Sequence, residues 1–168
     1  MTIKMRPGIY TDYTLTPLFS GRRGRPVGIA AKTPAACEGI QVIESLSQAK
    51  RIFGEESEAN RMMQLIAAVY ACTSPVIYAV GVQEDTDAAY QEALDLLCAS
   101  GAAVITLDRK SQPVYQYLKG KLPGAGEKLG VVAGIPETDP AELANALNCE
   151  RMCLAVPELR AGQLTRCV

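Results

Sequence analysis

The chain has 168 residues, of which 48% are hydrophobic and 21% charged, and its formal net charge is −1. This composition is ordinary for a folded domain and excludes wholesale disorder. Histidine is absent, which removes the usual general base near neutral pH and the partner that most serine and cysteine nucleophiles need. Much of enzyme chemistry is therefore closed to this chain.

Charge is distributed unevenly along the chain. Residues 1–32 carry six basic side chains and one acidic one, whereas the remaining 136 residues carry 11 basic and 17 acidic ones. We interpret this as a basic N-terminal segment on an acidic body, and the slightly acidic total argues against a nucleic-acid partner. No apolar run reaches the ~18 residues of a membrane span, and no segment of signal-peptide length follows the N-terminus. We expect no membrane partner and synthesis in the cytoplasm.

Six cysteines are present, and free thiols are the expected state of all of them. A chain of this length without an export signal is a poor candidate for a disulfide framework. Cys149 and Cys153 could supply two metal ligands, but no second closely spaced pair completes a tetrahedral site. We predict neither a metal nor a cofactor.

The first predicted element is an extended segment at residues 8–16, flanked by Pro7 and Pro17. Its residues alternate, so that one set faces one way and the other set the opposite way. Flanking prolines favour pairing at a sheet edge over the middle of a sheet. The segment is therefore either a half-buried strand or a detached arm.

A basic turn follows at 21–28, with the sequence GRRGRPVG. It precedes a strand and not a helix, so it does not fit a phosphate-binding loop. Its arginines could also contact nucleic acid, but we favour ion pairs with carboxylates of another copy, in a head-to-tail contact. The predicted subunit contacts of the extended segment and the turn are Ile9, Tyr10, Thr11, Asp12, Tyr13, Leu15, Arg22, Arg23 and Arg25.

The rest of the chain alternates between short apolar runs and amphipathic helical patterns. Predicted strands span residues 27–31, 75–82, 102–107, 129–135 and 151–156, and predicted helices span 45–53, 57–72, 86–100, 111–120 and 139–147. In these helices we expect Met62 in the core, Met63 on the surface and Tyr90 on the apolar stripe. Apolar runs without alternation are typical of strands covered on both faces. The predicted fold class is α/β, with a mainly parallel sheet and helices on both faces. We expect an arm and basic turn at 1–25 and an α/β domain at 26–168.

An alternative function follows from this fold class alone. A small doubly wound domain binds a nucleotide or other anion beyond the carboxyl ends of its strands. The loops after Val82 and Leu107 would form that crevice, with Asp108, Arg109 and Lys110 as its nearest charged groups. No glycine-rich turn follows any predicted strand, which counts against this alternative.

Six segments, taken in their order and spacing, resemble the N-terminal half of the contractile-tail sheath proteins of bacteriophages and prophage-derived particles. They are GIYTDYTLTP (8–17), GRPVGIAA (24–31), SLSQAKRIFG (45–54), AAVYACTSPVIYAVG (67–81), YQEALDLL (90–97) and NCERMCLAVP (148–157). The resemblance implies a non-enzymatic structural subunit whose α/β domain has a subtilisin-like outline without catalytic residues. Sheath subunits stack in helical rows around a tail tube and are linked by extended arms that add strands to their neighbours.

The resemblance makes residues 8–16 such an arm. It also implies a homo-oligomer whose partners are copies of itself and other tail subunits, namely sheath, tube, baseplate or terminator proteins. The expected location is a virion tail or phage-like particle assembled in the bacterial cytoplasm. Sheath proteins continue well past the position that matches Pro157, so the α/β domain is expected to be truncated relative to the family. A short paralogue, one piece of a split gene, and a cap or adaptor on true sheath remain open.

Overall fold

The computed structural model describes residues 24–35, 37–136 and 138–155, together with the backbone of residues 159–160 and 163–164. Most of the predicted arm and basic turn therefore lies outside the described residues. Of the nine predicted contact residues, only Arg25 falls within them. It is exposed and lies two residues before the first strand.

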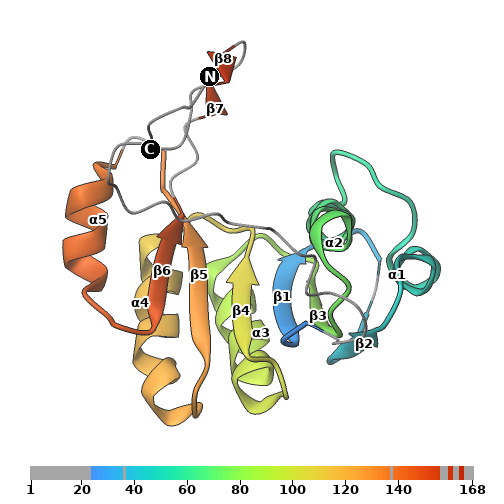
Figure 1. Cartoon of the computed structure of the whole chain (residues 1–168), viewed down its shortest axis with the longest axis horizontal. Coiled ribbons are helices and arrows are strands. Elements are labelled where there is room, and N and C mark those ends of the chain that lie inside the picture. Colours follow the sequence, from blue (N-terminus) through green and yellow to red (C-terminus); the bar gives the residue numbers. More distant parts are fainter. Residues whose placement is uncertain (1–23, 36, 137, 156–158, 161–162, 165–168) are drawn as a thin grey trace, which may run out of the picture.

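The sheet has six strands in the order β2-β3-β1-β4-β5-β6 (Figure 1). All neighbours pair in parallel except β2, which runs antiparallel to β3 at one edge. A separate two-stranded sheet joins β7 (Leu159–Arg160) and β8 (Gln163–Leu164). The strands of the main sheet are β1 (Val27–Lys32), β2 (Gln41–Ile43), β3 (Ile77–Val82), β4 (Val104–Leu107), β5 (Leu129–Ala133) and β6 (Met152–Ala155).

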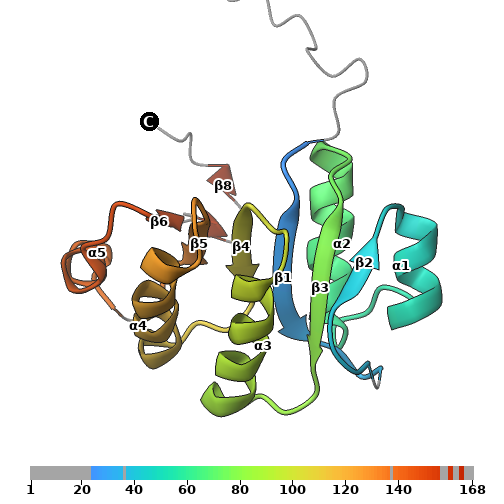
Figure 2. The same cartoon turned by 90° about the horizontal axis from the view of Figure 1, so that it is seen from below.

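Helices cover both faces of this sheet (Figure 2). On one face lie α1 (Leu46–Phe53) and α2 (Arg61–Cys72), and on the other lie α3 (Asp87–Ala99) and α4 (Gln112–Lys121), with α5 (Pro140–Leu147) beside α4. A short 3₁₀ helix, η1 (Leu122–Gly124), extends α4. The predicted α/β class with a mainly parallel sheet is confirmed. No helix in the described part of the chain has both the length and the apolar character needed to cross a bilayer.

Side-chain caps fix where four of the helices begin. The side chains of Ser45, Thr86 and Asp139 each accept a backbone N–H of the first turn that follows, which satisfies donors that the helix itself leaves unpaired. The predicted start of α2 near Ser57 is wrong. The N-cap of this helix is Asn60, whose side chain accepts the backbone N–H of Met63. The Asn60 amide also donates to the carbonyls of Phe53 and Glu55, so it holds the loop between α1 and α2 while it starts the second helix.

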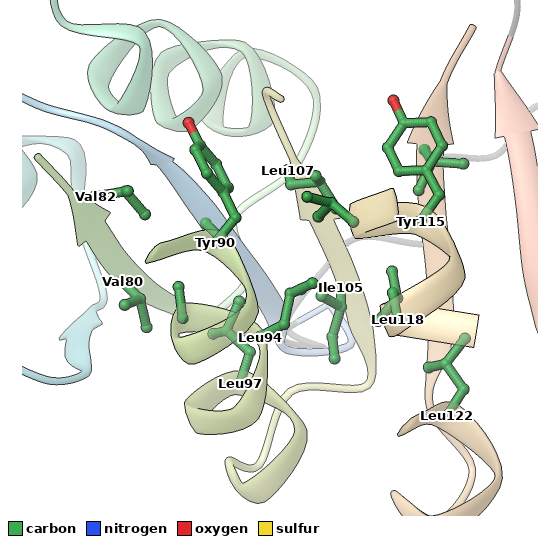
Figure 3. Packing of buried hydrophobic residues seen from close by; sticks show 14 of the residues in the cluster. Val80, Val82, Tyr90, Leu94, Leu97, Ile105, Leu107, Tyr115, Leu118 and Leu122 are labelled. Atoms are coloured by element: carbon green, nitrogen blue, oxygen red, sulfur yellow. The ribbon is translucent and has the colours of Figure 1, made fainter. Parts of the chain in front are cut away.

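The sheet separates two buried apolar clusters, as both-face coverage requires. In β1, Ile29 and Ala31 belong to the cluster under α1 and α2, whereas Ala30 belongs to the cluster under α3 and α4. Figure 3 shows the second cluster, in which α3 and α4 insert tyrosines and leucines between the residues of β3 and β4. The sequence pattern placed Met63 on the surface, and this is wrong. Met62 and Met63 are both fully buried.

Glycine at position 81 of β3 is required by a close approach. A Cβ added there would lie 2.7 Å from the Thr33 methyl carbon, and Thr33 is itself 1% exposed and donates its backbone N–H to Val82. We predict that Gly81→Ala lowers the free energy of unfolding by about 1–3 kcal/mol, the usual range for overpacking. Urea denaturation measures this change. Gly124→Ala is the matched control, since nothing lies within 4 Å of the added Cβ, and equal stability of the two variants would contradict the prediction.

Candidate functional site at the carboxyl edge of the sheet

The order of the strands marks one position on the sheet where ligands commonly bind in this class of fold. Taken in chain order, the five parallel strands lie in the spatial order second, first, third, fourth and fifth. The connection from β1 to β3 uses α2 on one face, and the connection from β3 to β4 carries α3 over the other face. The switch point therefore lies between β1 and β4, beyond their carboxyl ends.

Asp108, the first residue after β4, lies at this switch point. Its side chain is 7% exposed and accepts hydrogen bonds from the Tyr90 hydroxyl at 2.6 Å and from the Lys32 backbone N–H at 3.3 Å. The Arg61 guanidinium, at the start of α2, lies 3.5 Å from the same carboxylate. One carboxylate thus joins β1, α2, α3 and β4.

Arg109 forms a second node beside the first. Its Nε lies 2.6 Å from Asp87 and its Nη1 lies 2.5 Å from Asp85, and Nη1 also donates to the Asp85 carbonyl at 2.8 Å. The guanidinium carbon is 5.7 Å from the centre of the Tyr90 ring, within cation–π range. Arg61 lies 3.8 Å from Asp85 and connects the two nodes. We call Arg61, Asp85, Asp87, Tyr90, Asp108 and Arg109 the switch-point network.

Asp87 and Tyr90, two ionisable groups of this network, are held in the states they already have at neutral pH. The hydrogen bond from Arg109 is the main cause that lowers the pKa of Asp87, and Ser111 contributes to the same direction. Burial, followed by the hydrogen bond to Asp108, raises the pKa of Tyr90 far above its ordinary value. A carboxyl that stays ionised and a phenol that stays protonated offer no proton to exchange near pH 7. Neither Asp87 nor Tyr90 is therefore suited to transfer a proton near neutral pH.

An open depression of about 530 Å³ lies over the network, lined by Arg61, Asp85, Asp108, Arg109, Lys110 and Pro136. The structure brings together Asp108, Arg109 and Lys110, the residues of the alternative anion site. However, both guanidinium groups are already engaged by aspartates. Within the described lining, this leaves the single ammonium of Lys110 outside these ion pairs, and a phosphate would have to displace the aspartates. The arrangement does not favour an anion ligand.

The two outer edges of the sheet differ in how well they are covered. At β2, the Gln48 side-chain amide donates to the Val42 carbonyl and accepts from the Glu44 backbone N–H, as a neighbouring strand would. At β6, the carbonyls of Arg151 and Ala155 point toward β5, so the backbone groups of Leu154 point outward. Among the described residues nothing pairs with this outer side of β6. It is the more open edge for an added strand.

Sequence reasoning placed the subunit contacts in the N-terminal segment, and eight of them, from Ile9 to Arg23, lie outside the described residues. It named Asp108 and Arg109 only as charged groups of the alternative anion site, and it did not predict their ion pairs with Arg61, Asp85 and Asp87. Tyr90 was placed on the apolar stripe of its helix, where its buried ring does lie. The one available signal for the remaining members was their place just after or just before a strand or helix, because such ends meet at one edge of a parallel sheet.

The fold is that of an open, doubly wound α/β domain. Three solved structures have a similar fold. No protein-family model matches the sequence, and no curated protein does. The chain is similar to the helical sheath of the anti-feeding prophage in its contracted state, with a TM-score of 0.56 and 12% identity over 92% of this chain and 46% of that one.

Two baseplate structures of the same prophage give the same result. In the contracted state the TM-score is 0.56, with 17% identity over 94% of this chain and 48% of that one. In the 6-fold symmetrised baseplate the TM-score is 0.56, with 15% identity over 92% of this chain and 47% of that one. The resemblance to sheath proteins seen in the sequence is thereby confirmed at the level of the fold. The chain spans about half the length of these solved chains.

The titration of Asp87 tests the ion pairs of the network. We predict that Arg109→Gln raises the pKa of Asp87 toward its ordinary value, because the hydrogen bond that lowers it is lost. A lowered pKa in the folded state stabilises the protein above the unfolded pKa, and this stabilisation is lost as pH falls through the folded value. NMR titration of the side-chain carboxyl carbons measures the shift. An unchanged Asp87 titration in Arg109→Gln would contradict the assignment, and Lys50→Gln is the control because its partner is Glu55.

Proposed function

We propose that the chain is a structural subunit of a phage or phage-derived contractile tail, either sheath itself or a sheath-associated cap or adaptor. The observation that carries this proposal is the fold match to the sheath of the anti-feeding prophage over more than nine-tenths of the chain. The proposed role is non-enzymatic. Its proposed partners are copies of itself and other tail subunits, in a virion tail or a phage-like particle.

In this proposal, residues 1–25 attach the subunit to its neighbours, and residues 26–168 form the body of the subunit. Since the chain corresponds to about half of the solved sheath chains, we assign to it the α/β part of such a subunit. Contraction would need contacts that the described residues do not contain.

Assembly through strand exchange needs an edge that can accept a strand. Residues 8–16 have the alternating pattern of a strand with one buried face, and the outer side of β6 offers outward backbone groups at Leu154. The edge at β2 is closed by Gln48. In this proposal the N-terminal strand of one copy therefore adds to β6 of another, where new backbone hydrogen bonds supply the contact.

The alternative of a nucleotide-binding domain is not favoured by the switch point. The position where such a ligand would lie holds guanidinium groups paired with carboxylates, and its buried carboxylate is held by Tyr90 and Lys32. This network stabilises the sheet without any ligand.

Deletion of residues 1–23 tests the proposal. We predict that the full chain forms rings or tubes, alone or with the tail proteins encoded beside it, when viewed by negative-stain electron microscopy. The deletion variant should keep its α/β fold, since both apolar clusters are built from residues after position 26, and should lose assembly. Circular dichroism and the melting temperature serve as the control for folding. Assembly by a folded deletion variant to the same extent as the full chain would contradict the proposal.

A further inference from the structure

A groove lies beside α3, next to the connection from β3 to α3. It has a volume of about 360 Å³, and its walls come from the carboxyl end of β3 and from one flank of α3. Val80, Val82 and Ala93 form its apolar floor, and Leu96, 41% exposed, lies at its rim. We call it the α3–β3 groove.

The apolar surface continues from the groove onto β2. Val42 pairs in register with Tyr78, and residues directly opposite each other in antiparallel strands share a face. Tyr78 packs against the cluster under α3, so Val42 lies on the same side, where no helix covers β2 (Figure 2). It is 45% exposed. The floor residues themselves are 3–5% exposed, so Leu96 and Val42 are the exposed apolar side chains of this surface that a partner would cover.

The charged groups at the groove are carboxylates without a cation. Glu84 and Glu92 line it and are exposed, and within the described part of the chain neither lies at ion-pair distance from a lysine or arginine. The nearby aspartates differ, because Asp85 and Asp87 are paired with Arg109, and Asp95 with Lys121. The negative charge that the body leaves unneutralised in this region is therefore gathered at the groove.

The chain itself contains a segment of matching chemistry. Residues 18–23 read LFSGRR, two large apolar side chains followed by two arginines. We infer that the α3–β3 groove binds this segment of a second copy, with Leu18 and Phe19 on the apolar floor and Arg22 and Arg23 beside Glu84 and Glu92. This inference rests on the proposed function, and it names the receiving surface for the basic turn. Because β3 and β6 lie four strand positions apart, this groove belongs to a different copy from the β6 edge that receives residues 8–16.

The geometry separates the arginines from the Glu84 end of the groove of the same copy. Gly24 lies against Thr73 and Pro75, at the amino end of β3, because a Cβ added to it would meet their side chains at 3.2 and 3.6 Å. The groove lies at the carboxyl end, and the strand from Pro75 to Val82 is roughly 23 Å long at ~3.3 Å per residue. Arg22 is two residues from Gly24, and that backbone with an extended side chain spans only roughly 14 Å. The arginines therefore cannot span from Gly24 to Glu84 of their own copy, and we assign the contact with Glu84 to another copy.

A contact of this kind joins the amino end of one sheet to the carboxyl end of the next. The two surfaces are different, so the contact is heterologous, and its repetition gives a ring or an open helical filament and not a closed two-fold dimer. This is the geometry that a helical assembly needs. The exposed ion pairs at its rim also make the contact sensitive to salt, since such pairs are screened within ~10 Å at 0.1 M ionic strength.

A charge exchange in the full chain tests the inference. One variant carries Glu84→Lys with Glu92→Lys, and the other carries Arg22→Glu with Arg23→Glu. Each variant by itself places like charges on both sides of the contact, so two attractions become two repulsions. We therefore expect its self-association, measured by sedimentation velocity, to be at least about tenfold weaker than that of the wild type. Mixed in equal amounts, the two variants present opposite charges at both contacts, and association should return. Glu127→Lys with Glu150→Lys is the matched control, because both glutamates are exposed and lie away from the groove.

The outcomes separate this inference from the proposed function. Weak association of each variant and its return in the mixture support the groove contact, whether or not rings or tubes appear in the electron microscope. Rings or tubes formed equally well by the wild type and the Glu84→Lys, Glu92→Lys variant would overturn the groove contact and leave the proposed function standing. A mixture that stays as weakly associated as its components would also overturn it. A wild type that remains monomeric at all salt concentrations would overturn the groove contact, and the proposed function would also be overturned if the chain formed no ring or tube with the tail proteins encoded beside it.

Discussion

The Asp108 carboxylate is the contact on which the arrangement of the sheet depends. It lies where the chain reverses its direction of winding, and it holds the end of β1 through Lys32, the start of α3 through Tyr90 and the start of α2 through Arg61. A nearly buried carboxylate is costly unless its oxygens are hydrogen-bonded and its charge is opposed. Here both conditions hold, so the carboxyl edge of the sheet is fixed by the protein's own side chains.

This arrangement decides where the protein can act on other molecules. In many open α/β domains the switch point is left vacant for a ligand, whereas here Arg61 and Arg109 are engaged by the aspartates around them. In our proposal, the capacity for interaction lies instead on surfaces whose groups lack partners within the described residues. These are the outer side of β6 and the α3–β3 groove, together with the basic N-terminal segment that their chemistry complements. A subunit built for assembly is expected to concentrate its unpaired groups in this way.

Much of the fold could be predicted from the sequence, because each element carries a local signal. Continuous apolar runs predicted the buried parallel strands, and caps such as Thr86 and Asp139 marked the helix starts. The switch-point network had no such signal, since its ion pairs join residues 24 and 47 positions apart in the chain. In the sequence, an aspartate that forms an ion pair looks the same as an aspartate that caps a helix, so the local pattern does not distinguish the two. The start of α2 and the burial of Met63 were missed because they depend on Asn60 and on the packing of α2, which are tertiary features.

The central claim is that the N-terminal segment of each copy lies on another copy, so that the α/β body becomes one unit of a repeating assembly. A cryo-EM map of the assembled particle tests it most directly. The account predicts continuous density from Gly24 of one copy to the α3–β3 groove of the next, with the same contact repeated around the assembly. Density in which residues 1–23 fold back over the body of their own copy would contradict it.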